Sequence, residues 1–195
     1  MEDYYTRDSK ISTTQGYPYH SHTPYLPSFI KRQNEVVATE IDVGWQKLFS
    51  GLFYSAQEPI LYNYYLGASI YRFLWIRSFH SKILLSLTKD DSRITLTTIK
   101  LEFSSYDHEA IILSDEMKQL TIHDWEEFER LLENCSFWSM QPYIDNTNAR
   151  DGSSRLVEGH LKEKYWFVNR WSPDDNFSRA GEFLINKSGL EEIIY

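Results

Sequence analysis

The apolar positions between residues 36 and 65 repeat with the period of a helix. Five of them follow one another at i, i+3, i+4, i+7 and i+8: Trp45, Leu48, Phe49, Leu52 and Phe53. This spacing places them along one face of an α-helix. Glu58 precedes Pro59, and the residue before a proline is driven out of the α conformation. The pattern therefore predicts a short helix that ends before Glu58.

The next stretch has the pattern of β-strands. Segments 70–79, 82–88 and 93–103 are rich in Ile, Leu, Phe, Tyr, Trp and Thr, and turn residues such as those at 89–92 separate them. Apolar side chains occupy both alternating faces of 70–79. We therefore expect this strand to lie in the centre of an antiparallel sheet, with Trp75 in the core.

Residues 121–135 have the clearest helical pattern. Thr121 and Asp124 form a variant of the capping box. One face carries the apolar residues Trp125, Phe128, Leu131, Leu132 and Cys135, and the other carries Glu126, Glu127, Glu129 and Glu133. We expect Trp125 and Phe128 to be core residues and Cys135 to be a small core side chain.

The rest of the chain completes an α+β plan. Strands at 154–161 and 164–171 are expected to form a hairpin, followed by a helix at 176–187. Residues 1–34 have the composition of an extended N-terminal arm, with few aliphatic residues and three prolines. We expect five residues to pin this arm: Tyr17, Tyr19, Tyr25, Leu26 and Phe29. Residues 35–195 are then a single α+β domain, an antiparallel β-sheet with helices packed on one face.

Composition and charge narrow the class of protein. The 195 residues are 42% hydrophobic and 25% charged, as in ordinary globular proteins, and 16% are aromatic. The aromatic surplus fits a thick core or a partner-binding surface. The formal net charge is −8, and residues 107–195 carry 18 Asp and Glu against 9 Lys and Arg. Because nucleic-acid affinity rests on cationic side chains, a nucleic-acid partner is not expected, whereas a basic protein partner is.

Other classes of site lack a sequence signal. Cys135 is the single cysteine, so it forms no intramolecular disulfide and no cysteine-based zinc cluster. The six histidines are scattered, and no phosphate-binding glycine motif occurs. There is no signal-peptide pattern, and no apolar run approaches the roughly 20 residues of a membrane span. The sequence predicts a cytoplasmic protein without a metal, a cofactor or a membrane contact.

The predicted hairpin holds the richest cluster of polar side chains. Glu158 and His160 share one face of the first strand, and Arg170 lies on the second. Carboxylate, imidazole and guanidinium together suit either an acid–base site or a structural ion pair. We favour a structural pair between Arg170 and Glu158, because no nucleophile accompanies them.

Motifs in and around this hairpin resemble a family of uncharacterised bacterial proteins. They are Tyr71–His80 (YRFLWIRSFH), Phe137-Trp138, Asp151-Gly152 with Glu158-Gly159, and Tyr165 with Arg170–Pro173. Their order and spacing match over about residues 56–188. Family members carry Trp at the position of Arg155 and His at that of Trp166, and their Gly-rich stretch after the third strand is absent from this chain. The resemblance implies a bacterial origin and a shared fold, but no activity.

Two functions stay open at this point. The first is a non-catalytic protein-binding module, such as an immunity or inhibitor protein that neutralises a toxin or effector; Glu126, Glu127, Glu129 and Glu133 would then speed the encounter with a basic partner. The alternative is an enzyme for a small anionic substrate, with a sheet-borne site of Glu158, His160 and Arg170, joined by Arg72 or Arg77. A third hypothesis is nucleic-acid binding by a local basic patch of Arg72, Arg77 and Arg93 among aromatic residues, which the negative net charge opposes.

Overall fold

The computed structural model describes residues 17, 18, 20, 22–32, 35–62, 66–103, 109–144, 152–162, 164–171 and 175–192. Within them the chain forms β1 (Phe29–Arg32), β2 (Glu35–Ala38), α1 (Val43–Ser55), β3 (Ser69–Arg77), β4 (Lys82–Lys89), β5 (Ile94–Phe103), β6 (Ala110–Leu120), α2 (Ile122–Asn134), a 3-10 turn (Phe137–Ser139), β7 (Ser153–Leu161), β8 (Lys164–Trp171) and α3 (Asp175–Ser188). The predicted α+β class is confirmed.

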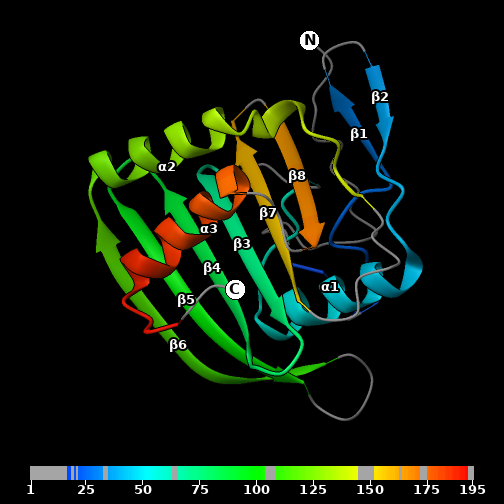
Figure 1. Ribbon diagram of the computed structural model, residues 1–195, viewed down its shortest axis with the longest axis horizontal. Coiled ribbons are helices and arrows are strands. Elements are labelled where there is room, and N and C mark those ends of the chain that lie inside the picture. The colour runs from blue at the N-terminus through cyan, green and yellow to red at the C-terminus, as the bar shows by residue number, and fades with distance from the viewer. Residues whose placement is uncertain are drawn as a thin grey trace.

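Six of these strands form one antiparallel sheet in the order β6-β5-β4-β3-β7-β8, and β1 pairs with β2 in a separate small sheet (Figure 1). β3 lies between β4 and β7, as its two apolar faces predict. Trp75 of β3 is fully buried. The sequence assignment of a central strand is therefore confirmed.

Helices α2 and α3 cover one face of the sheet, the face toward the viewer in Figure 1. Tyr71 of β3 packs against the ring of Trp125 in α2, with 5.1 Å between ring centroids. In α3, a Cβ at Gly181 would lie 2.5 Å from the Phe73 ring, so the glycine allows this helix to approach β3 closely. Trp125 and Phe128 are buried, as predicted. Thr121 and Asp124 form the predicted capping box of α2.

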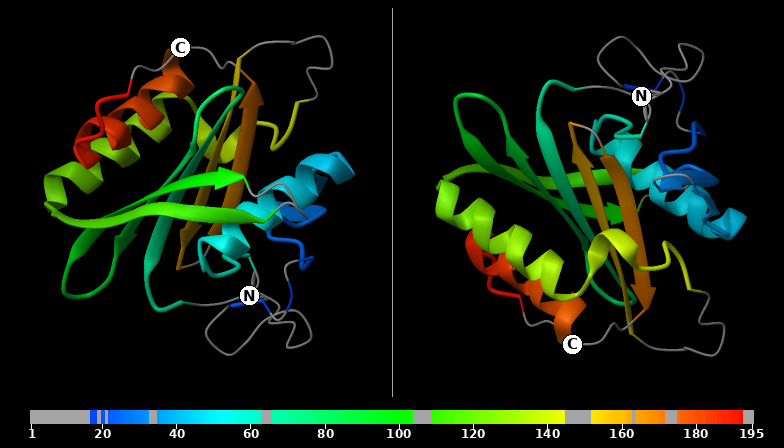
Figure 2. Two further views of the ribbon diagram at one scale, coloured as in Figure 1. Left: turned by 90° about the horizontal axis from the view of Figure 1, so that it is seen from below. Right: turned by 90° about the horizontal axis from the view of Figure 1, so that it is seen from above.

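Helix α1 lies against the opposite face (Figure 2). Its Phe53 ring packs on Arg72, which alternates with Tyr71 along β3 and so points to the other side. Trp45 contacts Trp171 of β8. The expectation of helices on one face thus holds for α2 and α3, whereas α1 covers the other face. A capping carboxylate, Asp42, begins α1, and the helix ends before Glu58-Pro59 as predicted.

The N-terminal segment is held against α1 and the sheet. Tyr25 and Leu26 are fully buried, as expected, whereas Tyr17 and Phe29 are exposed, contrary to expectation. Tyr19 lies outside the described residues. The Gln46 side chain donates to the backbone oxygen of Leu26. The expected boundary at residue 34 falls between β1 and β2, which pair with each other.

Strand β6 has no counterpart among the predicted elements. It follows β5 at one edge of the sheet, and a β-bulge interrupts their pairing next to Lys100 and Leu101. It begins beside α1 and ends at the start of α2 (Figure 2). Among the helices of the described part, none is long and apolar enough to cross a membrane.

Candidate functional site

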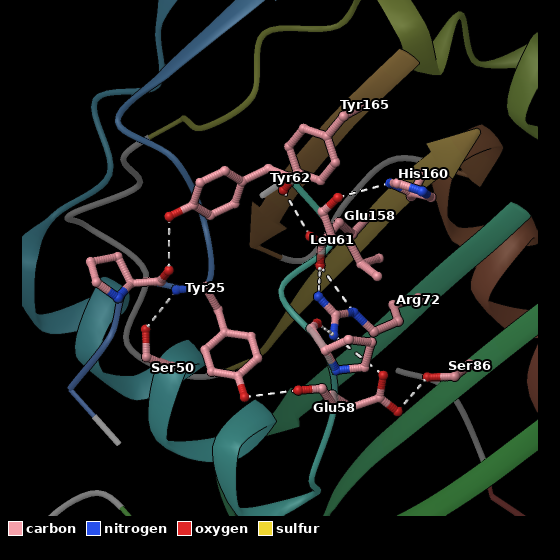
Figure 3. Close-up of polar contacts among 12 residues, drawn as sticks. Tyr25, Ser50, Glu58, Leu61, Tyr62, Arg72, Ser86, Glu158, His160 and Tyr165 are labelled. Carbon is pink, nitrogen blue, oxygen red and sulfur yellow. Dashed lines mark hydrogen bonds and ion pairs between the residues drawn. The ribbon is translucent and has the colours of Figure 1, made fainter. Parts of the chain in front are cut away.

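A buried cluster of polar side chains centres on Arg72 of β3. Its Nη2 and Nε lie 2.6 Å and 3.1 Å from one carboxylate oxygen of Glu158, on the neighbouring strand β7 (Figure 3). Register explains this contact, since Arg72 and Glu158 are directly paired positions of the two strands. The Arg72 guanidinium also stacks on the Phe53 ring, 4.2 Å from its centroid.

A second carboxylate reaches the same guanidinium from outside the sheet. Glu58 follows α1, and its Oε2 lies 3.3 Å from Arg72 Nη1. The same Nη1 donates to the backbone oxygen of Pro59 at 2.8 Å. Ser86 of β4 donates to the other carboxylate oxygen of Glu58. Arg72 therefore joins the segment after α1 to two strands of the sheet.

Tyr165 of β8 completes the surroundings of Glu158. Its hydroxyl donates to Glu158 Oε1 at 2.8 Å. Burial raises the pKa of Glu158 above its ordinary value, and the charge of Arg72 opposes part of that rise. Burial, with the nearby Glu158 carboxylate, also raises the pKa of Tyr165 well above its ordinary value, so the phenol keeps the proton that it donates.

Two further side chains tie chain segments to this cluster. The Tyr25 hydroxyl donates to the backbone oxygen of Glu58 at 2.9 Å, which attaches the N-terminal segment. His160 Nδ1 lies 2.8 Å from the backbone oxygen of Leu61. Because a carbonyl only accepts, this nitrogen carries the proton of the neutral ring. Figure 3 shows these residues around Arg72 between α1 and the sheet.

The centre of the cluster is sealed from solvent. The side chains of Arg72 and Glu158 are both 0% exposed, and His160 is equally buried. A buried charge is stabilised by the opposite charges and hydrogen bonds around it, so removal of one charged side chain leaves its partner buried without compensation. The arrangement is that of an internal structural cluster, here called the bracket, which joins the N-terminal segment, the chain after α1 and four strands. It leaves no surface for substrate at Arg72 or Glu158.

The structure separates the three residues of the alternative catalytic site. Glu158 and His160 share one face of β7, as predicted. Arg170, however, lies opposite Arg155, on the other face of the hairpin. It donates to the backbone oxygens of Asn169 and Gln141. The expected Arg170–Glu158 pair is therefore wrong, because side chains alternate along β8 and the arginine that meets Glu158 is Arg72.

The other arginines proposed for a site also have structural contacts. Arg77 is buried, stacks on Trp75 and pairs with Glu192 at 2.6 Å. Glu192 also accepts from Lys100. Arg93 is exposed beside Asp90. Since Arg72 and Arg77 face carboxylates inside the protein, the proposed basic patch does not form at these three positions.

The four glutamates of α2 differ in their surroundings. Glu127 pairs with Arg130 one turn along the helix, and Glu129 accepts a hydrogen bond from the Tyr71 hydroxyl at 3.1 Å. Glu126 and Glu133 are exposed. Of the proposed partner-binding set, these last two present their carboxylates most openly.

Strand β6 forms a second candidate site at the surface. Three successive apolar side chains stand out from it: Ile111, Ile112 and Leu113 are 59%, 39% and 54% exposed. No described strand pairs with its outer edge. Its second half is charged, with Asp115, Glu116 and Lys118. Charges of this kind protect sheet edges from other strands, and the first half of β6 lacks them.

Two glycines of the family-like motifs have structural roles, whereas Asp151, Ser172 and Pro173 of these motifs lie outside the described residues. Gly159 of β7 faces Trp138 and Tyr71, and a Cβ there would lie 2.9 Å and 3.0 Å from their rings. Gly152 adopts a φ of 145° and its backbone oxygen accepts from the Ser78 hydroxyl. Comparisons with protein-family models, curated proteins and solved structures found no match. The family resemblance stays a prediction.

Sequence reasoning missed Glu58 and Tyr25 as members of the cluster. The sequence pattern places Glu58 only at the helix end and Tyr25 only in the arm. One local signal was present: Arg72 stands between the apolar residues Tyr71 and Phe73 of a central strand. A charge in that position requires an opposite charge nearby.

We expect the neutral state of His160 to make the fold sensitive to acid. Burial and the charge of Arg72 lower the pKa of His160 to about 4, against an ordinary value of 6.5. Between these values the unfolded chain takes up a proton that the fold excludes, so the contribution of His160 to stability falls by up to about 3 kcal/mol as the pH drops from 6.5 to 4. Denaturant unfolding at both pH values measures this loss.

His160→Gln should reduce that pH dependence, because the amide does not titrate and still donates a hydrogen bond. His123→Gln, at an exposed site on α2, is the matched control and should keep it. Equal pH dependence in the wild type and His160→Gln would contradict the assignment.

Proposed function

We propose that this protein is a non-catalytic binding module that captures a basic protein partner along the outer edge of β6. The observation that carries the proposal is the exposed apolar run Ile111–Leu113 on an edge strand. Backbone N–H and C=O groups on such an edge bind an extended segment of another protein as an added strand. The neighbouring apolar side chains are then buried against the bound segment.

Charge selects the partner. The chain has a formal net charge of −8, and the acidic residues Asp115 and Glu116 lie on β6 itself. Glu126 and Glu133 extend the exposed acidic surface on α2, which begins where β6 ends. Such a surface attracts a basic protein over a distance and speeds its association. An immunity or inhibitor protein that covers a toxin or another effector suits this combination of size, charge and edge.

The enzyme alternative receives less support. Its Glu158 and His160 are buried, and Arg170 lies on the opposite face of the hairpin. An acid–base site requires that its groups reach a substrate within hydrogen-bond distance. The contacts of these residues instead favour a structural role, so we place the function at the surface.

Affinity capture from the source organism tests the proposal with three matched baits: wild type, Ile112→Lys and Val43→Lys. The lysine at position 112 puts a charge on the exposed edge, whereas Val43, 68% exposed, lies at the end of α1 away from β6. We expect the wild type and Val43→Lys to retain one basic partner that Ile112→Lys loses. Retention by Ile112→Lys, or the absence of any partner for the wild type, would contradict the proposal.

A further inference from the structure

A cavity of about 540 Å³ lies where the N-terminal segment, the end of α1 and the start of β6 meet. This volume is in the range of roughly 300–1,000 Å³ that is typical of small-ligand sites. Aromatic and polar side chains from three separated segments line it, among them Tyr17, Tyr25, Tyr54, Gln57 and Glu109. Because β6 contributes Ala110 to the same wall, the cavity adjoins the exposed edge of the sheet.

The lining has the chemistry of a cation site. Two partly exposed tyrosines, Tyr17 and Tyr54, line it, and the ring faces of tyrosines attract cations. Glu109 supplies a carboxylate, and among the described residues that line the cavity none is Lys, Arg or His. An anion would meet a negative wall, whereas a cation gains both the ring faces and an opposite charge.

The position of the cavity relates it to β6. The backbone N–H of Ala110 donates to Ser55 Oγ at the end of α1, 2.8 Å away. This contact occupies the outer edge at the first residue of β6, so a strand added farther along would end beside the cavity. A side chain near the end of that strand would therefore lie close to the cavity.

We propose that this cavity receives a lysine or arginine side chain of the protein bound along β6. The inference rests on the proposed function and adds the partner's anchoring residue to it. Tyr17 and Tyr54 contact the cationic group through their ring faces, and Glu109 neutralises its charge. A few side chains that fill pockets, arginine among them, carry a large share of the binding energy of protein interfaces.

The test uses free amino-acid amides on the full chain. Nα-acetyl-arginine amide and Nα-acetyl-lysine amide are titrated by NMR, beside the uncharged isostere Nα-acetyl-citrulline amide and tetramethylammonium. We expect the two cationic amides to bind and to shift signals of Tyr54 and Glu109, and citrulline amide to bind at least about fivefold more weakly. Equal binding of citrulline amide would overturn the proposal, and tighter binding of tetramethylammonium would replace it with a receptor for free small cations.

Four variants separate a specific site from a general charge effect. Glu109→Gln and Tyr54→Leu should each lower the affinity for Nα-acetyl-arginine amide by at least about threefold. Tyr54→Phe keeps the ring and Glu116→Gln removes a charge elsewhere on β6, so both should bind like the wild type. If Glu116→Gln lowers the affinity for arginine amide as much as Glu109→Gln does, the proposal is overturned. If the cationic amides bind in the cavity but Ile112→Lys still captures the partner, the cavity is a cation site and the proposed binding along β6 is wrong. If the amides do not bind but Ile112→Lys loses the partner, only the proposal for the cavity is wrong.

Discussion

Arg72→Met is expected to lower the free energy of unfolding by about 3–5 kcal/mol, the range measured when one partner of a buried ion pair is removed. The methionine fills similar space but leaves Glu158, which is 0% exposed, without its positive partner. It also removes the contact to Glu58 and the hydrogen bond to Pro59. Denaturant unfolding followed by circular dichroism measures the loss.

A second change distinguishes a lost charge from lost packing. Glu158→Gln in the Arg72→Met background removes the uncompensated carboxylate, so it should recover part of the stability, and the double-mutant cycle should show strong coupling. Arg93→Met, which removes an exposed arginine beside Asp90, is the control and should change stability by less than about 0.5 kcal/mol. An Arg72→Met variant as stable as this control would show that the bracket is dispensable.

Phe128→Ala is the other change with a large expected effect, about 3–5 kcal/mol as for aromatic residues in packed cores. The Phe128 ring is buried between α2 and the sheet, 5.2 Å from Tyr71, and it also stacks with Phe183 of α3. Its removal leaves a void that two helices and β3 share. Thermal and denaturant unfolding give the magnitude.

Ile122→Ala is the matched control, since Ile122 lies on the same helix with an exposed side chain. It should lose less than about 1 kcal/mol. Equal losses in the two variants would contradict the placement of α2 against the sheet through Phe128.

Local periodicity made much of the fold predictable. The apolar stripe of α1, the capping box of α2 and the two-faced apolar pattern of β3 are each set by residues close together in sequence. The sequence pattern does not predict strand β6, and the reason is physical. Both of its sides are largely exposed, so its apolar run and its charges do not alternate as they do in a half-buried strand.

The buried cluster was less predictable because its contacts join distant segments. Arg72 meets Glu158 across 86 positions of sequence, and no local pattern links them. The adjacent hairpin strand offered Arg170 as the nearer partner. Because side chains alternate along a strand, Arg170 and Glu158 lie on opposite faces of the β7–β8 pair and form no ion pair. Pairing across the sheet, and not along the hairpin, determines the cluster.

Hydrogen exchange on the purified complex with the captured partner tests the central claim most directly. A strand added to β6 gives new bonds to the backbone amides that point away from β5, while the inward amides already bond to it. We predict that the outward-pointing amides in the apolar first half of β6, from residue 112 on, slow by at least about tenfold in the complex. Unchanged exchange along β6, with protection appearing on another surface, would contradict binding at this edge.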